Sequence, residues 1–275
     1  ALELLVIDDG SSDRSFEMID GIKDDRIRLF RNPGRGIYAA LNFGLEQAEG
    51  KYVARCDSDD LYAQDRLRHQ YDWLTTHPEF SAICGGFAAI DPRAELCVNL
   101  MRGADHGEEI TEELRNGVTR TSLCTFLCDI ECARRIGGFR EFFVTAGDID
   151  FQLRLGETAR VWFDPQTVYF YRVHGESVTH QQAEALREFY EEMAREFQRQ
   201  RRRQGSDDLQ RNCPPSPPTH VVSRPSSAKA QFCTYLVGST WEAYKAGEIR
   251  EAFRLAISAC RLQPFVFQPW RNLMV

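Results

Sequence analysis

The chain has 275 residues, of which 43% are hydrophobic and 27% charged, ordinary values for a globular protein with one substantial core and an appendage. Its formal net charge of −7 at pH 7 argues against bulk nucleic-acid binding. No apolar stretch reaches the roughly 18 residues that suggest a membrane span, and the nine cysteines form no regular disulfide framework. We therefore expect a cytoplasmic protein in a reducing compartment, with the inner face of the membrane as an alternative location.

Strands and helices alternate through the first half of the chain. The apolar patterns predict strands at 2–7, 26–31 and 51–56, and helices at 15–22, 37–48 and 63–76. Repeated strand–helix units of this length predict a core of parallel strands. Farther along, the patterns predict irregular strand at 80–101, a helix starting at 148–155, and returning strands at 161–163 and 167–172.

The last third of the chain changes in composition. A charged amphipathic helix is predicted at 180–203, and its basic end, 199–203, is either a solvated helix terminus or a contact with an anionic membrane surface. Next comes a Pro/Ser-rich stretch that contains the sequence PPSPP, and after it a pair of helices broken near Gly247. We therefore divide the chain into a main α/β domain at 1–204, a linker at 205–227 and a C-terminal helical hairpin at 228–275.

Three of the cysteines, Cys124, Cys128 and Cys132, fall at four-residue intervals. This spacing predicts one face of a helix and differs from the paired spacing of a zinc knuckle. We interpret them as small buried residues, with structural zinc as the alternative.

Acidic clusters follow several predicted strands. Asp57-Ser58-Asp59-Asp60 comes directly after the strand at 51–56, Asp8 and Asp9 come after the first strand, and Asp148-Ile149-Asp150 opens a predicted helix. An Asp-x-Asp at the end of a strand supplies hard oxygen ligands for Mg²⁺ or Mn²⁺. A separate aspartate is then free to act as a base. Because open α/β sheets bind ligands outside the carboxyl ends of their strands, this pattern indicates group transfer from a phosphate donor.

Five sequence blocks, taken together and in order, resemble the family-two inverting glycosyltransferases of the GT-A fold. They are VIDDGSSD at 6–13, NPG through ALNFGL at 32–45, GKYVARCDSDD at 50–60, IGGF at 136–139 with GDIDF at 147–151, and YRVH at 171–174. The resemblance implies a Rossmann-like, mostly parallel sheet flanked by helices, followed here by a helical appendage. It also implies metal-dependent, inverting transfer from a nucleoside-diphosphate sugar, with UDP as the expected nucleotide.

The resemblance assigns roles to the metal and base residues. Asp59 is the expected primary ligand of Mg²⁺ or Mn²⁺, and Asp57 contacts the ribose or a metal-bound water. His174 completes the metal site or contacts the diphosphate, or else is a satisfied histidine at a strand end. Asp148 takes the proton of the acceptor hydroxyl. Asp60 is either a further acid of the site or the N-cap of the next helix.

The remaining implied contacts concern the donor and the acceptor. Asp9 is expected to bind the nucleobase, with Asp8 as its neighbour and alternative, and Arg172 either contacts the diphosphate or pairs with a surface acid. The acceptor would be a hydroxyl of a sugar, glycolipid or protein in surface polysaccharide or glycolipid biosynthesis. Gly147 stands where the family usually carries Glu. The resemblance also implies that the sequence starts after the family's first strand and helix.

The chain lacks the Gln-x-x-Arg-Trp block of processive synthases, which favours addition of a single sugar.

Two other classes of function remain possible from the sequence. A nucleotidyltransferase would also use paired aspartates and Mg²⁺, but it would need a glycine-rich, basic loop for a triphosphate near its first strand. A non-catalytic module that binds nucleotide sugars or a partner would fit a degenerate transferase domain carrying Gly147.

Overall fold

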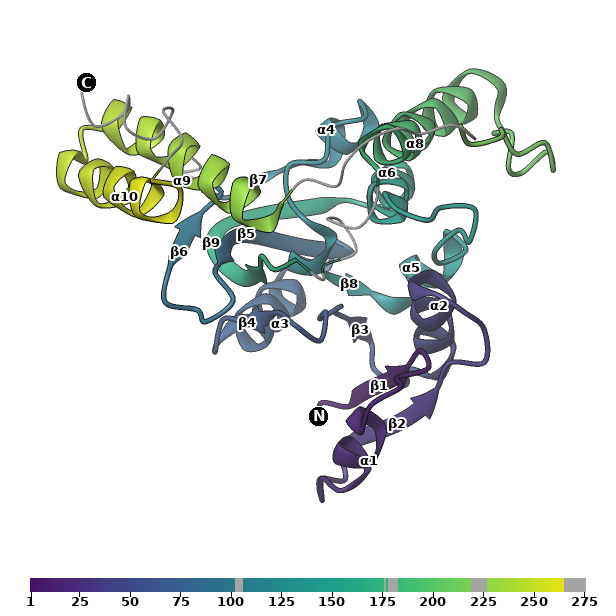
Figure 1. The fold of residues 1–275 in the computed structure, drawn as a ribbon. Helices are drawn as coiled ribbons and strands as arrows, with labels where there is room; N and C mark the ends of the chain where they lie inside the picture. The colour runs from purple at the N-terminus through teal and green to yellow at the C-terminus, as the bar shows by residue number, and fades with distance from the viewer. Residues whose placement is uncertain (102–105, 176, 178–182, 219–226, 265–275) are drawn as a thin grey trace.

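The computed structural model describes residues 1–101, 106–175, 177, 183–218 and 227–264 (Figure 1). In chain order the elements are β1 (Leu4–Asp8), α1 (Ser15–Asp20), β2 (Ile27–Arg31), α2 (Ile37–Gln47), β3 (Tyr52–Val53), β4 (Leu61–Tyr62), α3 (Arg66–Thr76), β5 (Ala82–Ile90), β6 (Cys97–Asn99), β7 (Glu108–Glu109), α4 (Thr111–Arg115), the 3₁₀ turn η1 (Leu123–Thr125), β8 (Leu127–Asp129), α5 (Ile130–Arg135), α6 (Gly147–Thr158), β9 (Val161–Arg172), α8 (Glu184–Gln204), α9 (Ala228–Lys245) and α10 (Ile249–Leu262). None of the helices in these ranges is long and apolar enough to cross a membrane.

The strands form a mixed α/β architecture. Among the described residues, β1 and β2 make a two-stranded parallel sheet, and seven further strands make a sheet whose main path is β3-β8-β5-β9-β4. The two longest ladders, β1–β2 and β5–β9, are parallel, while the shorter strands join in antiparallel fashion. The central strand β5 has the sequence AICGGFAAI and is buried along nearly its whole length, as expected for a strand covered on both faces. The predicted α/β fold class is confirmed.

One long strand replaces the two returning strands that the sequence predicts. β9 runs without a break from Val161 to Arg172, and its register against β5 shifts on both sides of Gly86. A Cβ at Gly85 would lie 2.8 Å from a methyl group of Val168, so the two glycines let the backbones approach where the ladder is irregular. The strand therefore continues past the irregularity, and its last residues lie beside the turn that follows β3.

The helix α8 is packed into the main domain. Its Tyr190 and Phe197 pack against Phe142 and Phe143, in the segment before α6, through edge-to-face and tilted aromatic contacts. Phe197 and Phe143 are almost completely buried. Such aromatic contacts add to the apolar burial that holds an element in place.

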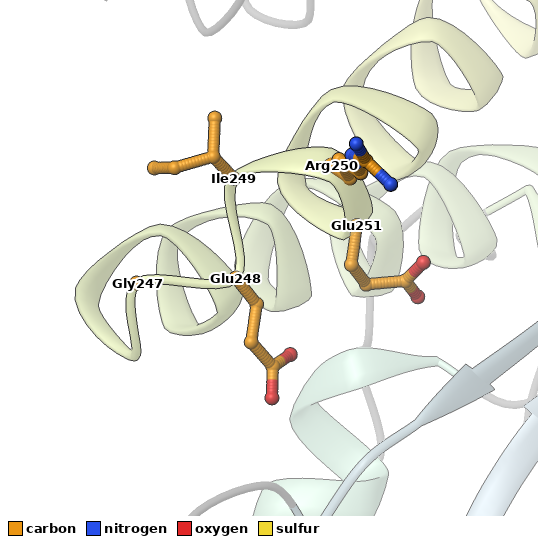
Figure 2. A pocket seen from close by; sticks show the side chains of 5 residues that line it. All are labelled: Gly247, Glu248, Ile249, Arg250 and Glu251. Carbon is orange, nitrogen blue, oxygen red and sulfur yellow. The ribbon is translucent and has the colours of Figure 1, made fainter.

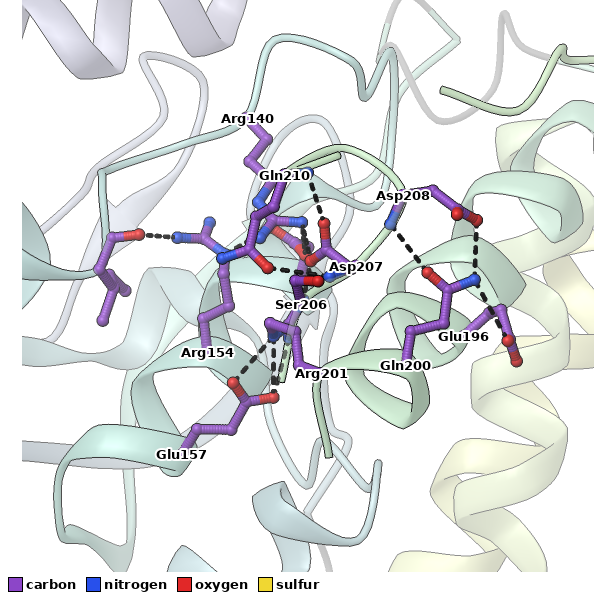
Figure 3. A network of polar contacts seen from close by, with 12 residues as sticks. Arg140, Arg154, Glu157, Glu196, Gln200, Arg201, Ser206, Asp207, Asp208 and Gln210 are labelled. Atoms are coloured by element: carbon purple, nitrogen blue, oxygen red, sulfur yellow. Dashed lines mark hydrogen bonds and ion pairs between the residues drawn. The ribbon is translucent and has the colours of Figure 1, made fainter. Parts of the chain in front are cut away.

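A buried ionic network fastens the chain just after α8 (Figure 3). Asp207 is fully buried and accepts hydrogen bonds from Arg140 at 2.7 Å and from Arg201 at 2.5 Å. Asp150, also fully buried, accepts from Arg154 at 2.8 Å. The stretch that we expected to begin a linker at Gly205 therefore starts with a turn anchored to α6 and α8.

The C-terminal hairpin shares a core with the sheet. Leu236 of α9 and Leu255 of α10 are buried in one cluster with Ala89 of β5 and Val98 of β6. Gly247 joins the two helices with a φ of 78°, a left-handed conformation that favours glycine. The hairpin is thus a packing element, and the last eleven residues of its predicted range, 265–275, lie outside the described part of the chain.

The turn between α9 and α10 also carries a surface hollow (Figure 2). It is lined by Gly247, Glu248, Ile249, Arg250 and Glu251, and none of the residues predicted for the metal, the donor or the base belongs to it.

The prediction of a single helical face for three cysteines is wrong. Cys124 lies in η1, Cys128 in β8 and Cys132 in α5, so the four-residue spacing crosses three elements. All three are buried and free, which confirms their interpretation as small buried residues. Periodicity misled here because a buried strand between two short helical turns also places small residues inside at such intervals.

Candidate active site

The acidic turn 57–60 connects β3 to β4, and hydrogen bonds with residues of β9 hold it in place. The hydroxyl of Tyr169 donates to Asp60 Oδ2 at 2.6 Å and accepts from the Asp57 backbone N–H at 3.2 Å. The Arg172 backbone N–H donates to Asp60 Oδ1 at 2.7 Å. Asp60 is only 8% exposed, and burial raises its pKa to about 6. Its carboxylate therefore braces the turn from inside. The alternative of an N-cap is wrong, because α3 begins at Arg66.

The structure brings Asp59 and His174 together on the outer side of this turn. His174 Nε2 lies 2.7 Å from Asp59 Oδ2, and both side chains are partly exposed, at 24% and 38%. Arg172 fixes the backbone beneath them, since its Nε donates to the Asp59 carbonyl oxygen at 2.7 Å. Another guanidinium N–H of Arg172 donates to the Pro92 carbonyl at 2.8 Å. The two residues expected at the metal thus meet, and Arg172 supports them through carbonyl oxygens.

Asp57 has a different partner. Arg55 donates to both carboxylate oxygens of Asp57, at 2.7 and 2.9 Å, in the two-pronged geometry that gives Arg–carboxylate pairs their strength. The thiol of Cys124 lies 3.7 Å from Asp57 Oδ2. The sequence analysis did not identify Arg55 as a partner of Asp57. The spacing could have indicated it, because residues two apart on an extended segment lie on the same side.

Asp148 lies in the first turn of α6 and is partly buried. It interacts electrostatically with Arg55, the same guanidinium that pairs with Asp57. It also interacts with Tyr38 of α2, whose hydroxyl accepts the Gly147 N–H at 2.8 Å. Electrostatic interaction with Arg55 therefore links the predicted base to the acidic turn, although the two are distant in sequence.

The first acidic pair organises the loops beyond β1. Asp9 accepts from Asn32 Nδ2 at 2.6 Å and from the Gly36 N–H at 3.0 Å. Asp8 accepts from the Ser11 N–H at 3.1 Å, and hydrogen bonding from Ser11 lowers the pKa of Asp8. Asp9 thus ties the end of β1 to the loop before α2.

The residues present suit a divalent ion that keeps open coordination positions. Within the described ranges, no three His, Cys, Asp or Glu side chains gather closely enough to hold a metal by themselves. Asp59 and His174 could supply two ligands, and Mg²⁺-type sites commonly take only one or two carboxylates and leave the rest to substrate phosphates and water. The pair therefore fits a metal that is held jointly by the protein and a diphosphate.

The chain is similar in sequence to several proteins that are named as glycosyltransferases. An uncharacterized glycosyltransferase of Haemophilus influenzae is 47% identical over 76 residues, which are 26% of this chain and 30% of that protein. One from Rickettsia conorii is 27% identical over 195 residues, 64% of this chain and 30% of that protein. The glucosyltransferase WfaP of Escherichia coli is 34% identical over 80 residues, 29% of this chain and 32% of that protein. The chain thus spans about a third of the length of these curated relatives.

The fold is similar to that of a solved protein structure. The crystal structure of residues 1–349 of TarS from S. aureus superposes with a TM-score of 0.53 at 14% identity, covering 98% of this chain and 79% of that one. The family model described as glycosyl transferase family 2 matches residues 1–143, just over half of the chain, and its range includes the acidic turn and Tyr38. The chain therefore belongs to glycosyl transferase family 2 and has the GT-A fold.

Proposed function

We propose that this glycosyltransferase moves a single sugar from a nucleoside-diphosphate sugar to a hydroxyl acceptor, with a divalent metal and with inversion at the anomeric carbon. The observation that carries the proposal is the 2.7 Å contact of Asp59 with His174 on the outer side of the acidic turn, with Asp148 set apart from it. A ligand pair beside a separate carboxylate meets the two needs of such a transfer, which are charge neutralisation on the leaving group and removal of a proton.

Asp59 and His174 would hold Mg²⁺ or Mn²⁺. When bound, such an ion neutralises negative charge on the diphosphate. Asp57, oriented by Arg55, would face the ribose or a water of the metal site. Arg172 would serve the donor indirectly by bracing the backbone of Asp59.

Asp148 would act on the acceptor. Its carboxylate takes the proton as the acceptor oxygen forms a bond to the anomeric carbon, while the bond from that carbon to the diphosphate oxygen breaks on the opposite face. The diphosphate leaves with the electron pair of the broken bond, so the anomeric centre inverts. Asp8 and Asp9 would shape the nucleobase end of the donor site through the loop that Asp9 holds.

A UDP-linked donor and a lipid-linked or polysaccharide acceptor are the first candidates. The name of WfaP describes transfer from UDP-Glc to a GlcNAc-diphosphoundecaprenol acceptor. Such an acceptor would place the enzyme on the cytoplasmic face of a membrane. The basic end of α8 is a weaker candidate for that contact, because Arg199 pairs with Glu192 and Glu196 and Arg201 with Glu157.

Asp59→Ala should weaken UDP binding in the presence of Mn²⁺ at least about tenfold, which corresponds to roughly 1.4 kcal/mol. The reason is that the variant removes the primary protein ligand expected at the metal, beside Asp57 and His174. Titration calorimetry measures the effect. The matched control is Asp164→Ala, which breaks a second carboxylate–histidine pair, Asp164 with His69 at 2.6 Å, outside the acidic turn. Equal affinity of the Asp59 variant and the wild type would rule out this metal assignment.

Turnover assays separate the proposed transfer from the other two classes. Release of UDP from a UDP-sugar with Mn²⁺, without consumption of a triphosphate, supports the transferase. Consumption of a nucleoside triphosphate would indicate a nucleotidyltransferase. Tight UDP binding with no turnover of any sugar nucleotide would indicate a binding module.

A further inference from the structure

The helix that carries Asp148 begins with an unusual cap. Ala146, the residue before α6, has φ 60° and ψ 12°, a left-handed conformation that is uncommon outside glycine, and it makes no side-chain cap bond. The first N–H of the helix, that of Gly147, instead donates to the hydroxyl of Tyr38 at 2.8 Å. Free N–H groups at a helix start need such acceptors, and here the acceptor comes from α2.

The same phenol fills the space where a side chain at position 147 would start. A Cβ added to Gly147 would lie 2.5 Å from Cζ, 2.7 Å from Cε1 and 2.9 Å from the hydroxyl oxygen of Tyr38. Real side chains do not tolerate such distances, so the two positions are mutually dependent. The polar group beside Asp148 is consequently a phenol from α2, at the place where the resemblance leads one to expect a glutamate from α6.

Packing gives Tyr38 a defined orientation. It is 8% exposed, its ring stacks on Phe139 with centroids 5.8 Å apart, and Phe139 stacks on Phe151 of α6 at 4.6 Å. Burial, and after it the charge of Asp148, raise the pKa of Tyr38, so the phenol keeps its proton. The neutral phenol is therefore fixed by its packing and by the Gly147 N–H at the start of α6, the turn that also carries Asp148.

We propose that Tyr38 is the positioning residue for Asp148, and that position 147 is glycine because the phenol occupies its side-chain space. The hydroxyl holds the first turn of α6 through the Gly147 N–H, and in this way it fixes the backbone from which Asp148 projects. This inference rests on the proposed function, since it assigns a partner to the proposed base. In this role Tyr38 affects the reaction only by positioning Asp148, without contacting the substrate itself.

The first test is Tyr38→Phe, which removes the hydroxyl and keeps the ring that packs on Phe139. We expect kcat for sugar transfer to fall roughly 10- to 100-fold because the base loses its orientation, while the KM for the donor and the affinity for UDP with Mn²⁺ stay at wild-type values. The control is Tyr190→Phe, which removes the hydroxyl of another buried tyrosine, in α8, and should leave kcat unchanged. An unchanged kcat in Tyr38→Phe, with an active wild type, overturns the positioning role.

The second test examines the shared space without any assay of activity. Gly147→Ala should lower the midpoint of urea unfolding in the wild type and should have little effect in a Tyr38→Leu background, because leucine lacks the ring atoms that meet the new Cβ. Equal effects of Gly147→Ala in both backgrounds would show that the two positions do not compete for space and would overturn the inference. If wild type transfers no sugar at all, the proposed function fails, whereas this cycle still reports on the contact.

Discussion

Asp148→Asn should lower the rate of sugar transfer about 10²–10⁴-fold, the usual contribution of a general base, while UDP binding with Mn²⁺ changes little. Asparagine has nearly the same shape but cannot take a proton. The pair that would hold the metal, Asp59 and His174, lies on the acidic turn and the end of β9, so it is left intact. Single-turnover kinetics with saturating donor, together with calorimetry of UDP binding, measures the two effects separately.

A matched control for this variant is Glu131→Gln. Glu131 is an acid in the first turn of α5, as Asp148 is in the first turn of α6, so both substitutions lose a similar favourable interaction with a helix N-terminus. Only the Asp148 variant should lose catalysis. A wild-type rate in Asp148→Asn would mean that another group removes the proton.

Asp150 cannot serve as a mild control, contrary to what its place in the first helical turn indicates. Its carboxylate is fully buried and lies 2.8 Å from Arg154 and 3.6 Å from Arg140. Substitution of Asp150 would leave the positive charges of Arg154 and Arg140 without this counterion, so a loss of activity would reflect a loss of folding. Loss of activity at Asp150 therefore does not identify the base.

Asp207→Ala should destabilise the fold by about 3–5 kcal/mol, because it leaves the largely buried side chains of Arg140 and Arg201 without their shared anion. Equilibrium unfolding in urea measures the change. The neighbouring Asp208→Ala is the control: Asp208 is partly exposed and bonds to Gln200 and Arg211, and ion pairs at the surface contribute little to stability. Similar losses for both variants would contradict the central place of Asp207 in the network.

The same carboxylate predicts how stability depends on pH. Burial alone would raise the pKa of Asp207, but its hydrogen bonds from the Gln210 N–H and from Arg201 and Arg140 lower it below the usual value. A group with a lowered pKa stabilises the folded state above its unfolded pKa of about 3.9, and this contribution is lost as the pH falls through the folded pKa. Wild type should therefore lose stability below about pH 4, and Asp207→Ala should lose less over that range.

Several local elements could be predicted from sequence with small errors at their ends, although the predicted strand at 51–56 is only Tyr52–Val53. The predicted strand at 26–31 is β2, Ile27–Arg31, and the predicted helix at 37–48 is α2, Ile37–Gln47. The hairpin broken near Gly247 is also found where it was expected. In each case the information is local, because apolar spacing, helix ends and glycine act within a few residues.

Short blocks in a fixed order were enough to indicate the family, the α/β class and the acids to be considered. What each acid does depends on the folded structure. Asp60 is turned inward by Tyr169, and Gly147 is matched to Tyr38, each across 109 residues of sequence. The physical reason is that the state of a carboxylate is set by burial and by its hydrogen-bond partners, and in folded chains those partners come from distant segments that no local pattern specifies.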